Sequence, residues 1–291
     1  MAKSAVIVHD NSGMVRRLES VDIVIRTLLI IWAIVILLPL AWVFYTSLKT
    51  NQDFFLSAWK WPSILQWKNY TRAWLQLGIG NSFLNTLVLL VGSMLLNTVI
   101  VGLGCYTLAR FDFRLRNVIY WYIIGSYFIS GLNTMVTSYI LMQKLHLLNS
   151  LFGLMLFYAA QPIVFNTLIL VAFMKGQAKE LDEAAYIDGA SYWQTFWYVG
   201  LPLARPGLLT INVFNFMRFY NDFINPLLLI RDPEKYPLSV AIYSMAQSMT
   251  YRADWVTLFA GFVMMIIPTI IVYSVFQKYI TQNLNIGALK G

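Results

Sequence analysis

Six long apolar stretches alternate with polar connections along the chain. Each is about 20 residues or longer, the length at which a helix crosses a bilayer. A helix also satisfies its own backbone N–H and C=O groups where water is absent. The stretches are Ile23–Ser47, Phe83–Ala109, Val118–Met142, Leu151–Met174, Leu208–Ile230 and Trp255–Tyr279. The pattern predicts an all-α integral membrane protein with six transmembrane helices in a domain of residues 23–280, between an N-terminal segment 1–22 and a tail 281–291.

Composition supports a membrane location. Of 291 residues, 59% are hydrophobic and 12% are charged, whereas soluble domains have about a quarter charged residues. The first apolar run is too long for the core of a cleavable signal peptide, so we expect it to stay in the mature protein. The single cysteine, Cys105, excludes an intrachain disulfide and a cysteine-rich metal site.

Basic residues in the connections predict the orientation. If six spans alternate, one side receives a cluster of Lys and Arg, and the positive-inside rule makes that side cytoplasmic. Its members are Arg16, Arg17, Arg26, Arg110, Arg114, Arg116, Lys175, Lys179, Arg205, Lys278 and Lys290. Both termini are then cytoplasmic. The net charge of +8 fits attraction to anionic lipid, and no compact basic and aromatic surface supports nucleic-acid binding.

The longest predicted cytoplasmic connection, Lys175–Pro206, has the sequence of a structured segment. Helix-favouring residues run from Glu180 to Asp188, and Gly189 then permits a left-handed turn. The sequence predicts two short helices that meet at this glycine. At helical spacing one face carries Leu181, Ala184, Ala185 and Asp188, beside an acidic ridge of Glu180 and Glu183. Such a surface suits a protein partner that buries the alanines and pairs with the carboxylates.

At these residues the chain resembles a known family. The run Glu183-Ala184-Ala185, followed by Gly189 and then by Val199-Gly200-Leu201-Pro202, is similar to the EAA signature in the membrane subunits of binding-protein-dependent ABC importers. The one departure is Val199 in place of the usual isoleucine. The resemblance implies that the segment, Leu201 and Pro202 included, is a coupling helix that docks in a cleft of a cytoplasmic ATPase subunit.

Two further stretches resemble the maltose-type second permease of the sugar-importing branch. They are Tyr220-Asn221-Asp222-Phe223 with Pro226-Leu227, and the terminal Gly287-Ala288-Leu289-Lys290-Gly291. The branch usually has tryptophan at the position of Tyr220 and a small branched residue near Leu289. The resemblance implies a type I importer permease of the inner membrane. Its partners would be a homologous second permease, two ATP-binding subunits, an extracytoplasmic solute-binding protein, membrane lipid and a sugar, and Gly287 and Lys290 would dock near the ATPase dimer.

Polar residues inside the fifth apolar stretch indicate either helix packing or a solute path. Asn215, Arg218, Asp222 and Asn225 lie at i, i+3, i+7 and i+10, with Asn221 beside them. Arg218 can form an intramembrane pair with Asp222, line the translocation path, or act as a gate that changes partners. In the third stretch Ser126, Ser130, Asn133 and Thr137 form a similar stripe, for which packing and pore lining both stay open.

Two predicted external loops are long. Asn51–Leu77 carries Trp59, Trp61, Trp67 and Trp74, which suit aromatic anchoring at the headgroups or contact with a binding protein. The loop Arg231–Asp254 is a candidate for substrate release, because the resemblance implies that its equivalent enters the sugar cleft of the binding protein.

The chain carries no phosphate-binding loop, no H-E-x-x-H and no G-x-S-x-G motif. We therefore expect no catalysis and no cofactor on this chain, with ATP and Mg²⁺ used by the partner ATPase. His9 and His146 are isolated. The alternative function is a stand-alone ion-coupled secondary transporter, although it has no use for the EAA segment and no inverted repeat is evident. An intramembrane hydrolase lacks a paired nucleophile and base. The sequence leaves the sugar open, an acidic uronate oligosaccharide included.

Overall fold

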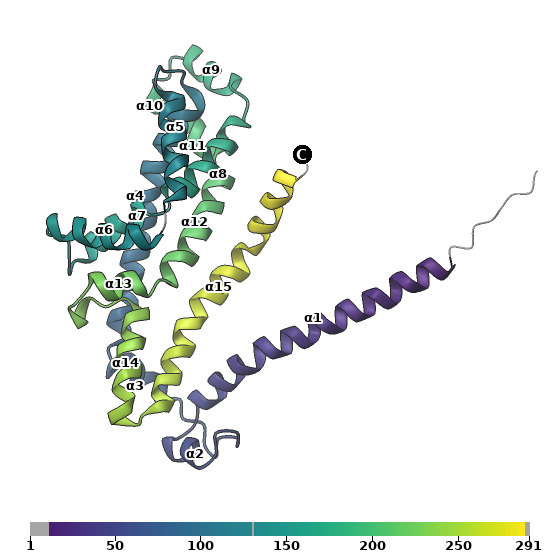
Figure 1. Ribbon diagram of the computed structural model, residues 1–291, viewed down its shortest axis with the longest axis vertical. Helices are drawn as coiled ribbons and strands as arrows, with labels where there is room; N and C mark the ends of the chain where they lie inside the picture. The colour runs from purple at the N-terminus through teal and green to yellow at the C-terminus, as the bar shows by residue number, and fades with distance from the viewer. Residues whose placement is uncertain (1–11, 130, 289–291) are drawn as a thin grey trace, which may run out of the picture.

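The computed structural model describes residues 12–129 and 131–288, and every regular element within them is a helix. Most of these helices run along one axis and form an elongated bundle (Figure 1). One end of the bundle carries α9 and α10, and the opposite end carries α2, α3 and α14. The predicted all-α class is confirmed for the described residues.

Within residues 12–129 and 131–288, three helices are long and apolar enough to cross a membrane. They are α1 (Ser12–Ser47), α4 (Ile79–Arg110) and α15 (Trp255–Ala288), and their candidate spans cover Asp22–Ser47, Ile79–Arg110 and Trp255–Gln277. The first, second and sixth predicted stretches are therefore continuous helices. Residues 1–11, 130 and 289–291, which include parts of the two predicted terminal segments, lie outside the described residues.

The fourth stretch is a bent pair. Helix α7 (Leu151–Ala160) and helix α8 (Ile163–Lys175) meet at 48°. Pro162, at the break, has no N–H to donate, so the ladder of main-chain bonds is interrupted there. The side-chain amide of Asn97 on α4 donates to the main-chain oxygen of Ala159, at 2.7 Å. A polar side chain from a neighbouring helix thus satisfies a carbonyl next to the bend.

The third and fifth stretches are not single helices, so the predicted count of six is not confirmed. The third consists of α5 (Arg116–Gly125), the short 3-10 turn η1 (Ser126–Phe128) and α6 (Gly131–Lys144), which runs across the bundle (Figure 1). Glycine at both boundaries weakens the helix there. The predicted polar stripe is interrupted at this turn; Ser130 and the side chain of Asn133 lie outside the described residues.

The fifth stretch divides into α12 (Arg205–Tyr220) and α13 (Ile224–Leu229). After α12 ends, the carboxylate of Asp222 accepts from the main-chain N–H of Asn225 at 3.3 Å and from its side-chain amide at 2.8 Å. An aspartate that accepts hydrogen bonds from the N–H groups of the next turn in this way favours the start of a new helix over continuation of the old one.

The end opposite α9 is a compact assembly of short helices. It contains α2 (Asn51–Leu56), α3 (Lys68–Leu75), the 3-10 turn η3 (Pro233–Lys235) and α14 (Leu238–Arg252). Lys49 is fully buried there and donates to the main-chain oxygens of Ser57 and Ala58 at 3.2 and 2.8 Å. Asn51, the first residue of α2, donates to Asp254 at 2.7 Å and so ties the start of α2 to the start of α15. The four tryptophans of the first loop are exposed.

Helix α4 is the centre of the bundle, with α7, α8 and α12 packed against it. Tyr158 of α7 and Phe219 of α12 stack in this core with ring centroids 4.7 Å apart. Helix α1, in contrast to α4, is hardly packed: it points away from the bundle (Figure 1), and the side chains of residues 22–40 are exposed. An apolar helix in this position must be covered by lipid or by another protein.

Candidate functional site: a coupling surface and an intramembrane polar face

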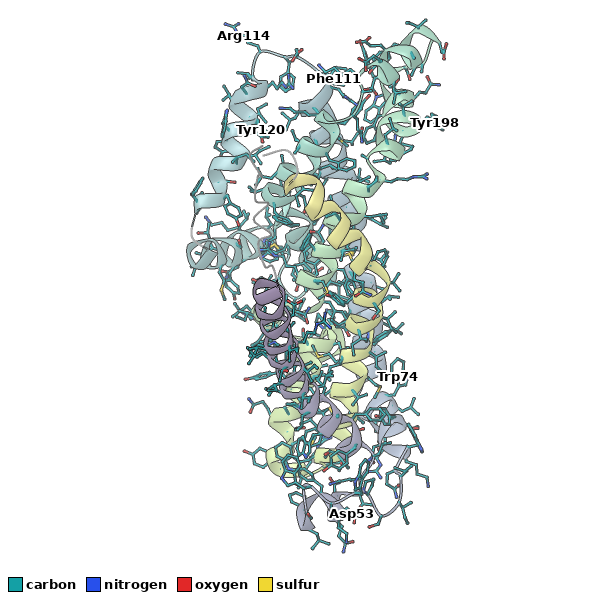
Figure 2. The ribbon with its side chains drawn as sticks, turned by 90° about the vertical axis from the view of Figure 1, so that its right-hand side faces the viewer. Asp53, Trp74, Phe111, Arg114, Tyr120 and Tyr198 are labelled. Carbon is teal, nitrogen blue, oxygen red and sulfur yellow. The ribbon has the colours of Figure 1, made fainter. Side chains whose placement is uncertain are left out.

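The segment 175–206, here called the coupling segment, lies at one end of the bundle (Figure 1). It contains α9 (Glu180–Ile187), α10 (Tyr192–Thr195), the π-turn η2 (Phe196–Gly200) and α11 (Leu201–Leu203). Figure 2 shows Tyr198 of this segment at the same end as Phe111 and Arg114, with Asp53 at the opposite end. The predicted pair of short helices is present.

Gly189 makes the turn between them, with φ of +83°. The N–H of Gly189 donates to the oxygen of Tyr186, and the N–H of Ala190 donates to the oxygen of Ala185, each at 3.0 Å. These two bonds are the Schellman motif, in which the residue after the helix adopts the left-handed conformation that glycine enters most readily. The next helix starts in a capping box, where Ser191 and Gln194 exchange side-chain and main-chain bonds.

Aromatic rings connect the coupling segment to the end of α4. Tyr106 lies 5.3 Å from Phe196 and 5.9 Å from Phe111, and Phe111 lies 5.4 Å from Tyr192, between ring centroids. Gly200 permits the contact with Tyr106, because a Cβ at this position would lie 2.5 Å from the Tyr106 ring. The glycine in the Val199-Gly200-Leu201-Pro202 run therefore has a packing role, and Leu201 and Pro202 are half-buried beside it.

A buried ion pair fixes α9 to α4, and no local pattern of residues indicates it in advance. Nε of Arg110 lies 2.7 Å from a carboxylate oxygen of Asp182, and both side chains are nearly inaccessible, at 4% and 6% exposure. The hydroxyl of Tyr106 donates to the other carboxylate oxygen at 3.1 Å. Arg110 also donates to the main-chain oxygen of Gln177 at 3.1 Å. The orientation of α9 thus depends on one arginine at the end of a transmembrane helix.

The outward side of the coupling segment is apolar and acidic. Its large apolar side chains are exposed: Leu181, Ile187, Tyr192, Trp193, Trp197 and Tyr198. The carboxylates of Glu180, Glu183 and Asp188 are exposed among them, as is Ala184, while Ala185 is half-buried on the inward side. The predicted acidic ridge is therefore accessible, and the predicted apolar face is shifted toward Ile187, which is 86% exposed. This outward side is called the coupling surface below.

Deep in the bundle three asparagines meet. Asn97 of α4, Asn166 of α8 and Asn215 of α12 are buried, with at most 1% exposure. The amide of Asn166 donates to the oxygen of Asn97 at 2.7 Å and to that of Asn215 at 3.2 Å, and Asn215 donates to Asn97 at 3.1 Å. Asn215 is thus a packing residue in this triad, whereas Arg218, three residues later in α12, is exposed.

We expect Asn97→Leu to lower the stability of the bundle by about 2 kcal/mol. The variant loses the bonds of Asn97 to Ala159, Asn166 and Asn215, and interhelical hydrogen bonds in membranes average about 0.6 kcal/mol each. Thermal unfolding in detergent measures the change. Thr107→Val, on an exposed position of the same helix, is the control and should leave the midpoint unchanged; an equal midpoint for Asn97→Leu and wild type would contradict a structural role for the triad.

The other members of the predicted polar seam separate into two groups. Arg218 and Asn221 are exposed, and the ion pairs among the described residues do not include Arg218. Asp222 bonds Asn225 instead. The proposed pair of Arg218 with Asp222 is therefore absent: α12 ends at Tyr220, so the spacing of the two residues is not helical.

Residues 98–286 match the model of a family described as binding-protein-dependent transport system inner membrane component. The chain belongs to this family. The matched range contains the coupling segment, α12 and most of α15, whereas α1 to α3 precede it. Membership excludes the stand-alone secondary transporter, because transport in this family depends on a binding protein.

Individual relatives of this family agree on carbohydrate transport. The diacetylchitobiose uptake system permease protein NgcG of Streptomyces coelicolor is 32% identical, over 91% of this chain and 88% of its own. The sulfoquinovosyl glycerol transport system permease protein SmoH of Agrobacterium fabrum is 30% identical, over 88% and 89%. A chain in the crystal structure of a bacterial ABC transporter involved in the import of the acidic polysaccharide alginate superimposes with a TM-score of 0.79 at 26% identity, over 95% of this chain and 99% of that one. The resemblance to a carbohydrate ABC importer permease is confirmed.

Gly287, one of the two predicted C-terminal docking residues of this permease, lies inside α15, which continues to Ala288. Lys290 lies outside the described residues.

Proposed function

We propose that this permease moves an oligosaccharide, delivered by an extracytoplasmic binding protein, across the inner membrane when a partner subunit hydrolyses ATP. The observation that carries the proposal is the coupling surface. Its helix is held from behind by Arg110, its turn is fixed by Gly189, and its front exposes large apolar side chains among carboxylates. A large apolar side chain that a rigid element exposes, as Ile187 is here, can fill a pocket on a partner protein and anchor the interface.

The occupant of the coupling surface is an ATP-binding subunit in this proposal. The acidic residues Glu180, Glu183 and Asp188 would pair with basic residues at the rim of a cleft in the ATPase, because charge complementarity sets specificity and association rate. ATP and Mg²⁺ would bind only to that subunit. The C-terminal end of the chain, with Gly287 in the last turn of α15 and Lys290 after it in the sequence, would dock near the ATPase dimer. The α9 end and both termini are then cytoplasmic, as predicted from Arg110, Arg114 and Arg116.

Helix α1 supports a second permease as partner. Its candidate span covers 26 residues, and the side chains of residues 22–40 are all exposed, so the bundle buries only its end. We propose that the homologous second permease covers this helix, and that the translocation path lies between the two permeases. Two ATP-binding subunits, one for each permease, complete the complex. Alternating access then follows when closure of the ATPase dimer moves both coupling segments.

We expect Glu183→Lys to weaken binding of the ATP-binding subunit roughly tenfold, because the reversed charge replaces attraction by repulsion at a partly desolvated contact. The measurement is a pull-down from membranes that contain all subunits, with uptake by proteoliposomes beside it. Glu234→Lys is the matched control for ATPase binding: it is the same change in η3, which contacts Asn81 near the start of α4, at the end of that helix opposite Arg110. Equal ATPase binding by the two variants would remove the docking role of the acidic ridge.

A further inference from the structure

Arg218 lies at the centre of the membrane-spanning region. Three residues before it, Asn215 contacts Asn97, near the middle of the span Ile79–Arg110. Two residues after it, the hydroxyl of Tyr220 donates to the main-chain oxygen of Met265 at 2.7 Å, near the middle of the span Trp255–Gln277. Because a helix rises 1.5 Å per residue, Arg218 is within about 5 Å of both levels.

Arg218 is exposed at this depth, and no carboxylate in the described part of the chain forms an ion pair with it. The nearest acidic residue in sequence, Asp222, is engaged by Asn225. A charged side chain at mid-membrane is costly when it faces lipid and almost always faces a protein interior or a water-filled cavity. The exposed face of α12 at Arg218 is therefore turned toward another subunit or a solute path.

The neighbours of Arg218 suit a sugar better than a lipid chain. Asn221, also exposed, donates its amide to the main-chain oxygen of Met217 at 2.7 Å, which leaves its side-chain oxygen free to accept from a hydroxyl. Phe214, one turn before Arg218, is half-buried and contacts the ring of Phe165 at 5.4 Å between centroids. Arg218 and Asn221, three residues apart and both exposed, provide a cation for a charged group and an amide acceptor for a hydroxyl. Phe214 adds an aromatic ring that can contact an apolar sugar face.

We propose that Arg218 is the residue of this permease that recognises the anionic group of an acidic oligosaccharide during translocation. The inference rests on the proposed function. A guanidinium binds a carboxylate through two parallel N–H···O bonds, which gives orientation as well as attraction. Asn221 then accepts from a neighbouring sugar hydroxyl. The competing partner for Arg218 is a fixed carboxylate of the second permease. Such a permanent ion pair would not need the exposed amide of Asn221, whereas a saccharide would bind both Arg218 and Asn221.

The test compares an acidic and a neutral oligosaccharide of the same length in the complete importer. The complex with its ATPase, second permease and binding protein is placed in proteoliposomes, and uptake of a uronate pentasaccharide and of a glucose pentasaccharide is measured with ATP hydrolysis. We expect wild type to import the uronate and Arg218→Gln to reduce that uptake at least tenfold, chiefly through a higher KM. Arg218→Lys should recover part of the loss. Arg114→Gln, at an exposed arginine in the turn after α4, is the matched control.

The other outcomes distinguish the two levels of the proposal. Import of the neutral sugar only would overturn the acidic substrate class and leave the proposed function standing. Loss of complex assembly in Arg218→Gln would show that Arg218 pairs with the second permease, and unchanged uronate uptake would remove it from the path. A wild-type complex that imports neither sugar and shows no ATP hydrolysis stimulated by the binding protein would overturn the proposed function itself.

Discussion

Arg110→Ala should detach the coupling segment from the bundle and abolish ATP-driven uptake. The change leaves the carboxylate of Asp182 buried without its cation, and removal of one member of a buried ion pair costs about 3–5 kcal/mol. The ordered position of α9 is the structure most directly affected, because Arg110 also bonds the main chain at Gln177. Membrane insertion should persist, since the apolar spans are unchanged.

The double variant Arg110→Met, Asp182→Leu removes the charges of the ion pair and keeps side chains of similar volume. Apolar residues of similar volume often replace a buried pair at little cost, so this variant should bind the ATP-binding subunit better than either Arg110→Met or Asp182→Leu alone. A double-mutant cycle on ATPase binding measures the coupling energy. Additive losses would mean that the two residues do not act together, and wild-type uptake by Arg110→Ala would show that the pair is irrelevant to coupling.

Gly189→Val should have a comparable effect through the backbone alone. Gly189 has φ of +83°, and a side chain there strains the chain by about 1–3 kcal/mol, most severely when it is β-branched. Space is not the cause, because a Cβ at this position would meet no atom within 4 Å. The turn should therefore open, and α9 and α10 should lose the angle at which they present Ile187 and Tyr192.

Gly189→Asn is the matched control, since asparagine tolerates the left-handed conformation better than other residues with a side chain. It should retain most ATPase binding and uptake, whereas Gly189→Val should lose both while it still assembles with the second permease. Equal losses in the two variants would mean that side-chain bulk at position 189 matters and backbone strain does not. Wild-type binding and uptake by both would mean that the turn at Gly189 is not needed for coupling.

The coupling segment was predictable because its signals are local. Helix-favouring residues before Gly189 and the capping sequence after it act over a few residues, so the two helices and the turn follow from the sequence. The contact of Arg110 with Asp182 was not predictable in the same way. Arg110 already had a role as an orientation signal, and Asp182 lies in the sequence between the two members of the predicted acidic ridge without a role of its own. Only the folded chain brings the two residues together.

The interrupted stretches show a second limit of the sequence. Hydrophobicity alone predicts that residues 208–230 form one helix, but Asp222 bonds the N–H of Asn225 and starts a new one. The helical spacing that suggested a pair between Arg218 and Asp222 does not exist past Tyr220. Asn215 likewise reads as part of a solute path, although in the bundle it bonds Asn97 and Asn166 from the adjacent helices.

The central claim is that the coupling surface touches an ATP-binding subunit. Ile187 is 86% exposed on that surface, and the single cysteine, Cys105, is buried, so Ile187→Cys offers a selective site for a thiol-attached photocrosslinker. Tyr251→Cys, at a position 91% exposed at the other end of the bundle, is the control. In membranes that hold the whole importer, the account predicts a permease–ATPase adduct from position 187 and none from position 251. Active import with no ATPase adduct from position 187, or with equal adducts from both positions, would contradict it.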